Sequence, residues 1–309
     1  MGHRKVFIVP LLIVMLGGNT ILGFGQQVKD VIESFEALSS KPEIIFLQND
    51  LKIPSRKGHF QGVQLIKKNG TEKLLISGSS LTTAYILQAD LATKKTEQLI
   101  KLMDAPFRHA GGIQVSKQYL VVGIEDNFTK TASKLCLYNY DDGSLYKARS
   151  SMTISREGEP KKQTAGSMGI LALESEYLTV ASNWDSRNWD FYLLNLQENI
   201  QKTLGSFSAP DNWASYQSIN LLKDKEAIYA IGFYQNESVA YADLILVSKL
   251  KTFDLIMEKV HTKAFNCKEG VDFGGAAGLQ VDNEGLLHIW GTQKDPMKQI
   301  VINKFSQKK

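Results

Sequence analysis

The sequence predicts an all-β protein in which five four-stranded antiparallel sheets form a ring, within a single domain that spans residues 26–309. Three observations predict this fold. A short motif recurs about every 50 residues, each period holds three or four short β-rich runs, and one further strand-like run precedes the first period.

In most copies the recurring motif contains glycine and ends in an amide residue. It reads "HFQGVQ" at 59–64, "HAGGIQ" at 109–114, "AGSMG" at 165–169, "SYQSIN" at 215–220 and "GAAGLQ" at 275–280. Measured at the last residue, successive copies are separated by 50, 55, 51 and 60 residues. A period of this length is typical of propellers and solenoids.

The secondary structure predicted within each period distinguishes a propeller from a solenoid. Each motif is followed by a second β-rich run ("KLLISG", "YLVVGIE", "YLTVAS", "AIYAIGF", "LLHIWGT") and by a third, and a fourth is visible in "TEQLIKL" and "FDLIMEKV". Between periods no segment has the 3.6-residue periodicity of an amphipathic helix, which excludes an α-solenoid. Four antiparallel strands per period form one blade of a β-propeller.

The two ends of the chain are expected to close the ring together. The fifth period stops after three runs, at "QIVINKFSQKK", whereas "PEIIFLQNDLKI" at 42–53 has no period of its own. An unpaired sheet edge is prone to pair with another chain, so we expect residues 42–53 to supply the outer strand of the last blade. Residues 28–40 are expected to form a short helix or an irregular lead-in.

Glycines in the motif are expected where the innermost strands crowd the central axis. They are Gly111, Gly112, Gly166, Gly274 and Gly275. They lack the strand–loop–helix context of a nucleotide-binding loop.

Residues 1–25 have the layout of a signal peptide: basic "MGHRK", apolar "VFIVPLLIVMLGG", then small residues before Gln26. A membrane anchor is the alternative, but Pro10, Asn19 and Thr20 interrupt the apolar stretch, which is shorter than the ~20 residues a span requires. We therefore expect a secreted or periplasmic protein with no membrane attachment after cleavage.

Composition excludes some partners. The net charge is +4 and falls to +2 without Arg4 and Lys5, and no basic stripe indicates nucleic acid. Cys136 and Cys267 have no metal-type spacing and are expected to be free thiols, with a disulfide the less favoured alternative. We expect a monomer with no cofactor and no metal.

Two families of loops are expected to emerge on one face of the ring, and they are longer than the turns of the opposite face. One family joins successive blades and the other joins the second and third strands within a blade. Long loops on a rigid scaffold are common binding sites, and the mouth of the central channel is the natural concavity.

Five ionisable residues on this rim are candidates for catalysis: His59, His109, Glu125, Asp185 and Asp272. The two histidines occupy equivalent places in adjacent blades and could act as acid and base or bind a ligand; carboxylates from different blades could face each other across a glycosidic bond. The competing interpretation is structural: histidines that bond the neighbouring blade and carboxylates that cap turns.

Five further residues are candidates for ligand binding: Arg108, Asp126, Trp184, Arg187 and Trp213. A tryptophan can stack on the apolar face of a sugar or another planar ligand. An arginine or aspartate can bond hydroxyl or carboxylate groups. For Trp184 the alternative is a tryptophan that packs between blades.

The strand pattern and ring closure resemble the five-bladed β-propeller superfold, which includes secreted glycoside hydrolases and some lectins. No catalytic motif of the propeller glycosidases is matched, so the resemblance carries no residue roles. It implies a secreted protein that binds a small molecule or glycan at the channel mouth. The alternatives are a carbohydrate-active hydrolase or lyase that uses the rim carboxylates or histidines, and a protein-interaction platform. Because the rim residues differ from blade to blade, one asymmetric site is expected.

Overall fold

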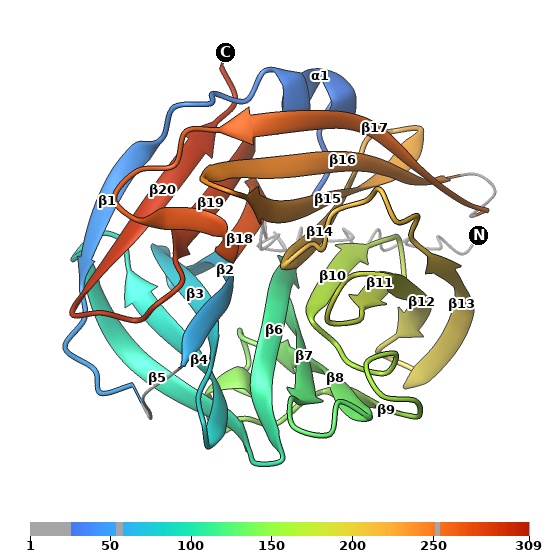
Figure 1. Cartoon of the computed structure of the whole chain (residues 1–309), viewed down its shortest axis with the longest axis horizontal. Helices are drawn as coiled ribbons and strands as arrows, with labels where there is room; N and C mark the ends of the chain where they lie inside the picture. The colour runs from blue at the N-terminus through green and yellow to red at the C-terminus, as the bar shows by residue number, and fades with distance from the viewer. Residues whose placement is uncertain (1–25, 54–57, 251–253, 309) are drawn as a thin grey trace, which may run out of the picture.

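The structure is a computed structural model that describes residues 26–53, 58–250 and 254–308 (Figure 1). The predicted signal peptide, residues 1–25, lies outside the described residues.

Strands make up most of the described chain, as the sequence predicts. In chain order they are β1 (Glu43–Gln48), β2 (His59–Lys68), β3 (Thr71–Ser79), β4 (Thr83–Asp90), β5 (Lys95–Asp104), β6 (Phe107–Ser116), β7 (Tyr119–Asp126), β8 (Ala132–Asn139), β9 (Met152–Glu157), β10 (Ser167–Ala172), β11 (Tyr177–Ser182), β12 (Asn188–Asn195), β13 (Ile200–Ser208), β14 (Ser218–Lys223), β15 (Ala227–Asn236), β16 (Val239–Lys249), β17 (Leu255–Phe265), β18 (Val271–Val281), β19 (Leu287–Gln293) and β20 (Gln299–Ser306).

Antiparallel pairing groups these strands in fours. The ladders run β2–β3–β4–β5, β6–β7–β8–β9, β10–β11–β12–β13 and β14–β15–β16–β17, and the last joins β18, β19 and β20 to β1. In Figure 1 the first strand of each group, β2, β6, β10, β14 or β18, lies nearest the centre of the ring.

The sheets are more continuous than the sequence predicts. Single parallel pairings, Ala277 with Gly62 and Ser167 with Gly112, join innermost strands of neighbouring groups. A third, Gln48 with Lys95, joins β1 to β5. The hydrogen-bonded sheets are therefore a closed sheet of eight strands, an open sheet of eight and a sheet of four. Some neighbouring inner strands come close enough at the axis to form a backbone pairing. The pattern of apolar residues within one strand does not show how close that strand lies to the next group.

The strand that closes the ring, β1, lies within residues 42–53, as the sequence predicts. β1 pairs antiparallel with β20 from Glu43 opposite Lys304 to Gln48 opposite Gln299. Most of its side chains are exposed, and Leu47 is buried. The N-terminal strand thus covers the outer edge that β20 would otherwise expose.

Helical structure is short. The predicted lead-in contains α1 (Val31–Glu36), whose N-terminus is capped by the Asp30 carboxylate, and a single 3₁₀ turn, η1, spans Leu145–Lys147. The helix buries Val31 and Phe35 against β14–β20. Within the described ranges, no helix has the length and apolar character needed to span a membrane.

Five apolar clusters hold the ring together, one between each pair of neighbouring groups. For example, Ile86 of β4 packs in one cluster with Ile113 of β6, and Leu47 of β1 packs in another with Phe60 of β2. Three clusters lie at the remaining boundaries. Burial of apolar surface is the main stabilising contribution, and here it depends on contacts between neighbouring groups of strands.

The axis glycines are confirmed in part. A Cβ on Gly111 would collide with the carbonyl oxygen of Gly166 on the neighbouring inner strand. In β18, however, the close approach is at Gly278, where a Cβ would collide with the carbonyl oxygen of Val63, whereas Gly275 lies against Lys294. Both predicted free cysteines, Cys136 and Cys267, are unpaired.

Candidate functional site

Two cross-strand pairs at the start of the inner strands form the centre of the site. His59 begins β2 and lies opposite Ser79 at the end of β3. His109 lies near the start of β6, opposite Glu125 near the end of β7. Since both inner strands begin on the same face of the ring, the antiparallel register brings the four side chains to one rim.

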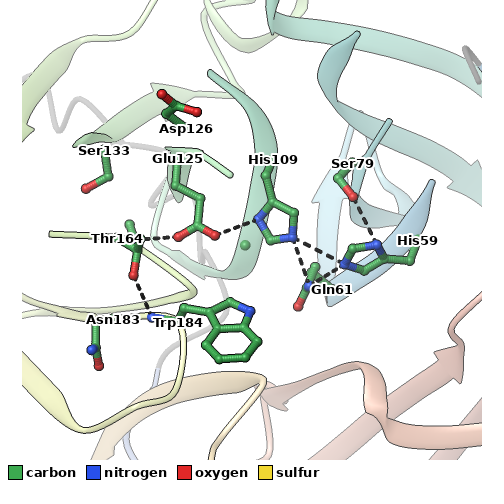
Figure 2. Close-up of polar contacts among 12 residues, drawn as sticks. His59, Gln61, Ser79, His109, Glu125, Asp126, Ser133, Thr164, Asn183 and Trp184 are labelled. Atoms are coloured by element: carbon green, nitrogen blue, oxygen red, sulfur yellow. Dashed lines mark hydrogen bonds and ion pairs between the residues drawn. The ribbon is translucent and has the colours of Figure 1, made fainter. Parts of the chain in front are cut away.

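These side chains form a continuous series, here called the polar chain: Ser79, His59, His109 and Glu125 (Figure 2). Ser79 Oγ lies 3.2 Å from His59 Nδ1, and the Nε2 atoms of the two histidines lie 3.2 Å apart. His109 Nδ1 lies 3.2 Å from Glu125 Oε1. Gln61 contributes its Nε2, 2.6 Å from His59 Nε2 and 3.3 Å from His109 Nε2.

The polar chain is buried except at His59, and Ser79 is 4% exposed. His59 is half-buried, His109 is 3% exposed and Glu125 is fully buried. The pKa of His59 is lowered to about 4, mainly by burial and then by the neighbouring His109 and Lys294. His59 is therefore neutral at pH 7.

Glu125 extends the polar chain to a third group of strands. Its Oε2 accepts a hydrogen bond of 2.8 Å from the backbone N–H of Ala165, just before β10. Its Oε1 and the facing His109 Nδ1 have no other polar partner and are poorly aligned for a hydrogen bond. A buried carboxylate in such a place requires a counter-charge or a proton.

Trp184 is the exposed aromatic residue beside this cluster. It follows β11, its backbone N–H donates to Thr164 Oγ1 at 2.7 Å, and its side chain is 45% exposed. Lys130 Nζ lies 4.6 Å from the centre of the ring. In Figure 2 the indole points toward the side of the view that holds Gln61 and His59. This placement fits the predicted stacking role.

Asp126 and Arg108 are next to the polar chain but bond other parts of the rim, Asp126 the loop after β7 and Arg108 the β3–β4 connection. The Asp126 carboxylate accepts hydrogen bonds from Phe128 and Thr129. Burial alone would raise its pKa, and these donors outweigh burial, so the pKa is lowered. Arg108 donates to the carbonyl of Leu81 at 2.7 Å. Both residues shape the rim.

Arg187 and Trp213 have structural contacts that the sequence did not predict. The Arg187 guanidinium donates to the carbonyls of Pro210, Trp213 and Ala214. Trp213 is buried against Trp189 and other aromatic rings. The Arg187 donors are occupied by these carbonyls and Trp213 packs among aromatic rings, so both residues support the loop between β13 and β14, and a ligand-binding role for them stays a prediction.

The two remaining carboxylates do not join the polar chain. Asp185 accepts from the backbone N–H of Arg187 at 3.3 Å, and Asp272 accepts from that of Gly275 at 2.5 Å. Both are turn-capping contacts, the structural alternative considered for them. Within the described ranges, no three His, Cys, Asp or Glu side chains group in a way that could hold a metal ion.

Four residues that lie in or beside the site were not identified from the sequence: Gln61, Ser79, Lys130 and Lys294. Gln61 lies two residues after His59 in the motif, so its side chain shares a strand face with the histidine. Ser79 could have been found from the β2–β3 register. The positions of Lys130 and Lys294 depend on loops that no pattern describes.

Comparison with known proteins identifies the fold. No protein-family model and no curated protein sequence matches this chain. Solved structures do: a GH43 endo-arabinanase from Bacillus licheniformis has a TM-score of 0.53 at 10% identity, over 81% of this chain and 95% of its own. The native arabinanase of Bacillus subtilis has a TM-score of 0.52 at 12% identity, over 79% and 96% of the two chains.

A third structure belongs to another glycosidase family. The GH32 β-fructofuranosidase of Bombyx mori has a TM-score of 0.50 at 10% identity, over 87% of this chain and 64% of its own. At such low identity these likenesses establish the fold, a β-propeller, and leave function to the site.

Proposed function

We propose that this protein is a five-bladed β-propeller that binds a glycan at the mouth of its central channel. The five-blade assignment is supported by the five groups of four antiparallel strands and by the five apolar clusters between them. The binding face is the one that carries the polar chain.

One observation carries the proposal: polar groups from two blades converge beside an exposed aromatic ring. Sugars present hydroxyl groups at their edges and C–H groups on their faces, so their sites combine hydrogen-bonding groups with an aromatic platform. His59 and Ser79 supply the hydrogen-bonding groups, and Trp184 supplies the aromatic platform. Phe128, on the neighbouring loop, is 83% exposed and could contact a longer glycan.

Calorimetric titration with arabino-, galacto- and fructo-oligosaccharides tests this proposal. We expect one saturable site per chain for at least one of these sugars. Trp184→Ala should weaken binding about tenfold, the effect of losing one aromatic contact of ~1.4 kcal/mol. The matched control is Phe46→Ala, an exposed aromatic on β1, which should bind as the wild type does. Equal affinity of Trp184→Ala and wild type would place the site elsewhere.

A second candidate function is cleavage of the bound glycan, as hydrolase or lyase. It is favoured by the fold, because the similar structures named above are two arabinanases and a β-fructofuranosidase. Most glycoside hydrolases use two facing carboxyl groups, whereas the polar chain contains one, Glu125. Cleavage here would therefore have a histidine as the second proton-transfer group.

Product analysis separates the two candidates. The protein is incubated with whichever oligosaccharide binds, and new reducing ends or unsaturated ends are measured. Cleavage that disappears in folded Glu125→Gln would establish the enzymatic function. Binding with no new chain ends over days would limit the protein to recognition.

We also propose that residues 1–25 direct export and are removed. The basic, apolar and small-residue segments support this proposal. N-terminal sequencing of the exported protein should begin near Gln26. Recovery of intact Met1 from the cytosol would contradict it.

A further inference from the structure

We propose that Glu125 sets the direction of every hydrogen bond in the polar chain, so that His109 carries two protons and His59 is neutral with its proton on Nδ1. Glu125 is in this view a positioning residue, which acts on the ligand-facing groups through the two histidines. The inference deepens the proposed glycan site, and its physical basis is independent of any ligand.

The first step concerns the buried end. The Glu125 carboxylate is fully buried, and its Oε2 is occupied by the Ala165 N–H. Burying an unpaired carboxylate is costly. The group 3.2 Å from Oε1 is His109 Nδ1, and both atoms are otherwise without a partner. With both ring nitrogens protonated, His109 would place a positive charge against this carboxylate at that distance.

The second step concerns the contact between the histidines. Two Nε2 atoms 3.2 Å apart cannot both be bare or both be protonated without repulsion. If His59 held the Nε2 proton, His109 would be neutral and Glu125 would lack a counter-charge. If His109 holds it, the imidazolium pairs with Glu125 and His59 Nε2 becomes the acceptor. In the second arrangement the single lone pair of His59 Nε2 is shared between the His109 N–H and the Gln61 amide, which lies 2.6 Å away.

The third step concerns the other end of the polar chain, where Ser79 is 4% exposed. Neutral His59 with a bare Nε2 carries its proton on Nδ1, which then donates to Ser79 Oγ at 3.2 Å. The Ser79 hydroxyl hydrogen is thereby directed away from His59. In the proposed glycan site, Ser79 would present a donor to an oxygen of the sugar.

The charges around the histidines are consistent with this arrangement. Burial, and after it the neighbouring His109 and Lys294, which follows β19, lower the pKa of His59, so His59 is the ring expected to be neutral. The neighbouring charged residues, Arg108 and Asp126, are bonded to the Leu81 carbonyl and to the 126–129 loop. Glu125 is thus the carboxylate in contact with the histidine pair.

The experiment is a long-range ¹H–¹⁵N spectrum of the imidazole rings in ligand-free protein spanning residues 26–309. His261 and His288 are the other two histidines in that range, and His261→Gln, at a half-exposed position, aids assignment. At pH 7 we expect His109 to be protonated on both nitrogens and His59 on Nδ1. A proton on His59 Nε2 at pH 7 would overturn the proposal, whatever the variants do.

Two variants add a test of cause. Glu125→Gln removes the counter-charge, so His109 should lose its second proton at pH 7 and the pKa of His59 should rise from about 4 toward 6.5. Lys294→Gln, the matched control, should also raise the pKa of His59 but leave its proton on Nδ1. An unchanged His109 in folded Glu125→Gln would contradict the proposal. No sugar is present, so a failure here is distinct from a failure to bind glycan.

Discussion

Arg187 illustrates how a residue with a plausible binding role can be committed to the scaffold. Its guanidinium donates to three backbone carbonyls of the 210–214 segment at 2.7, 2.8 and 2.7 Å. Arginine suits this role because its planar fork presents several donors in fixed directions. The stretch "NWDSRNWD" at 183–190 indicates an unusual loop around Arg187. It does not show that the 210–214 segment, whose carbonyls Arg187 bonds, lies beside it.

We expect Arg187→Ala to lower the free energy of unfolding by about 2–4 kcal/mol, because several carbonyls lose a charged donor. Arg187→Lys should recover only part of this loss. Urea denaturation measures the effect, with exposed Lys162→Ala as a control that should stay within about 0.5 kcal/mol of wild type. If Arg187→Ala is as stable as the control but binds glycan poorly, the original ligand-binding assignment is correct.

Asp90 gives the protein a specific sensitivity to acid. Hydrogen bonds from Lys73 Nζ, at 2.5 Å, and from the Thr93 N–H lower its pKa from 3.8 to about 2. A carboxylate whose pKa is lowered on folding stabilises the protein above its unfolded pKa and loses that contribution as pH falls.

Between pH 4 and pH 2 we therefore expect the free energy of unfolding to fall more steeply in wild type than in Asp90→Asn. Urea denaturation across pH 2–7 measures both slopes, and the variant should be less stable at pH 7. Parallel curves over the whole range would show that Asp90 contributes nothing to acid sensitivity.

Among the strands, β1 is expected to stabilise the closed ring although most of it is exposed. Its side chains are mainly exposed, yet Leu47 is fully buried in the cluster between the first and last groups. We expect Leu47→Ala to cost about 2–4 kcal/mol through lost contacts and a residual cavity. The adjacent Phe46, 44% exposed, supplies the control: Phe46→Ala should change stability by no more than about 0.5 kcal/mol. Thermal denaturation compares the two, and similar melting temperatures would mean that β1 does not hold the ring closed.

Strand position explains which elements the sequence could predict. Inner and middle strands are buried on both faces and appear as apolar runs, so β2, β7 and β11 are recognisable. The outermost strand β13 has almost no buried residue, and β9 alternates within only six residues. Neither presents a clear apolar run, which is why a fourth strand was visible in only two periods.

The candidate site, too, could be predicted from the sequence only in part. The motif placed His59 and His109 at equivalent positions, and the turn after β6 returned Glu125 to the same rim, both as predicted. The contact between the histidines depends on the separation of β2 and β6 at the axis. That separation follows from the close packing of Gly62 of β2 against Gly112 and Ile113 of β6, which is a property of the assembled ring.

At the scale of the whole molecule, the last residue of the recurring motif has a function beyond strand formation. Gln64, Gln114 and Asn220 are buried at the axis and connect sheets to one another. Asn220 donates to the Ile113 carbonyl and accepts from the Leu279 N–H and from Gln64. The motif copy that ends in Gly169 lacks such an amide.

The N-terminal segment supplies an amide at that part of the ring. Gln26 Nε2 donates to the Ile170 carbonyl at 2.6 Å, and the Val28 N–H bonds the Lys223 carbonyl. The recurrence of Gln and Asn is plain in the sequence, but their partners are backbone groups of other blades. The sequence therefore indicated the position of these amides and not their role.

Gln114 tests whether the axial amides join the five groups into one cooperative unit. Its Oε1 accepts from the N–H groups of Ile170 and Leu221, and its Nε2 donates to the Leu221 carbonyl. Gln114→Leu keeps a similar volume but leaves buried backbone groups without partners, each costing about 1–3 kcal/mol. We expect a total loss of about 3–5 kcal/mol and a single lower unfolding transition by calorimetry. The same substitution at exposed Gln98 of β5 should be nearly neutral. If Gln114→Leu instead unfolds in two separate steps, the blades adjoining Gln114 depend on this amide and the rest of the ring does not.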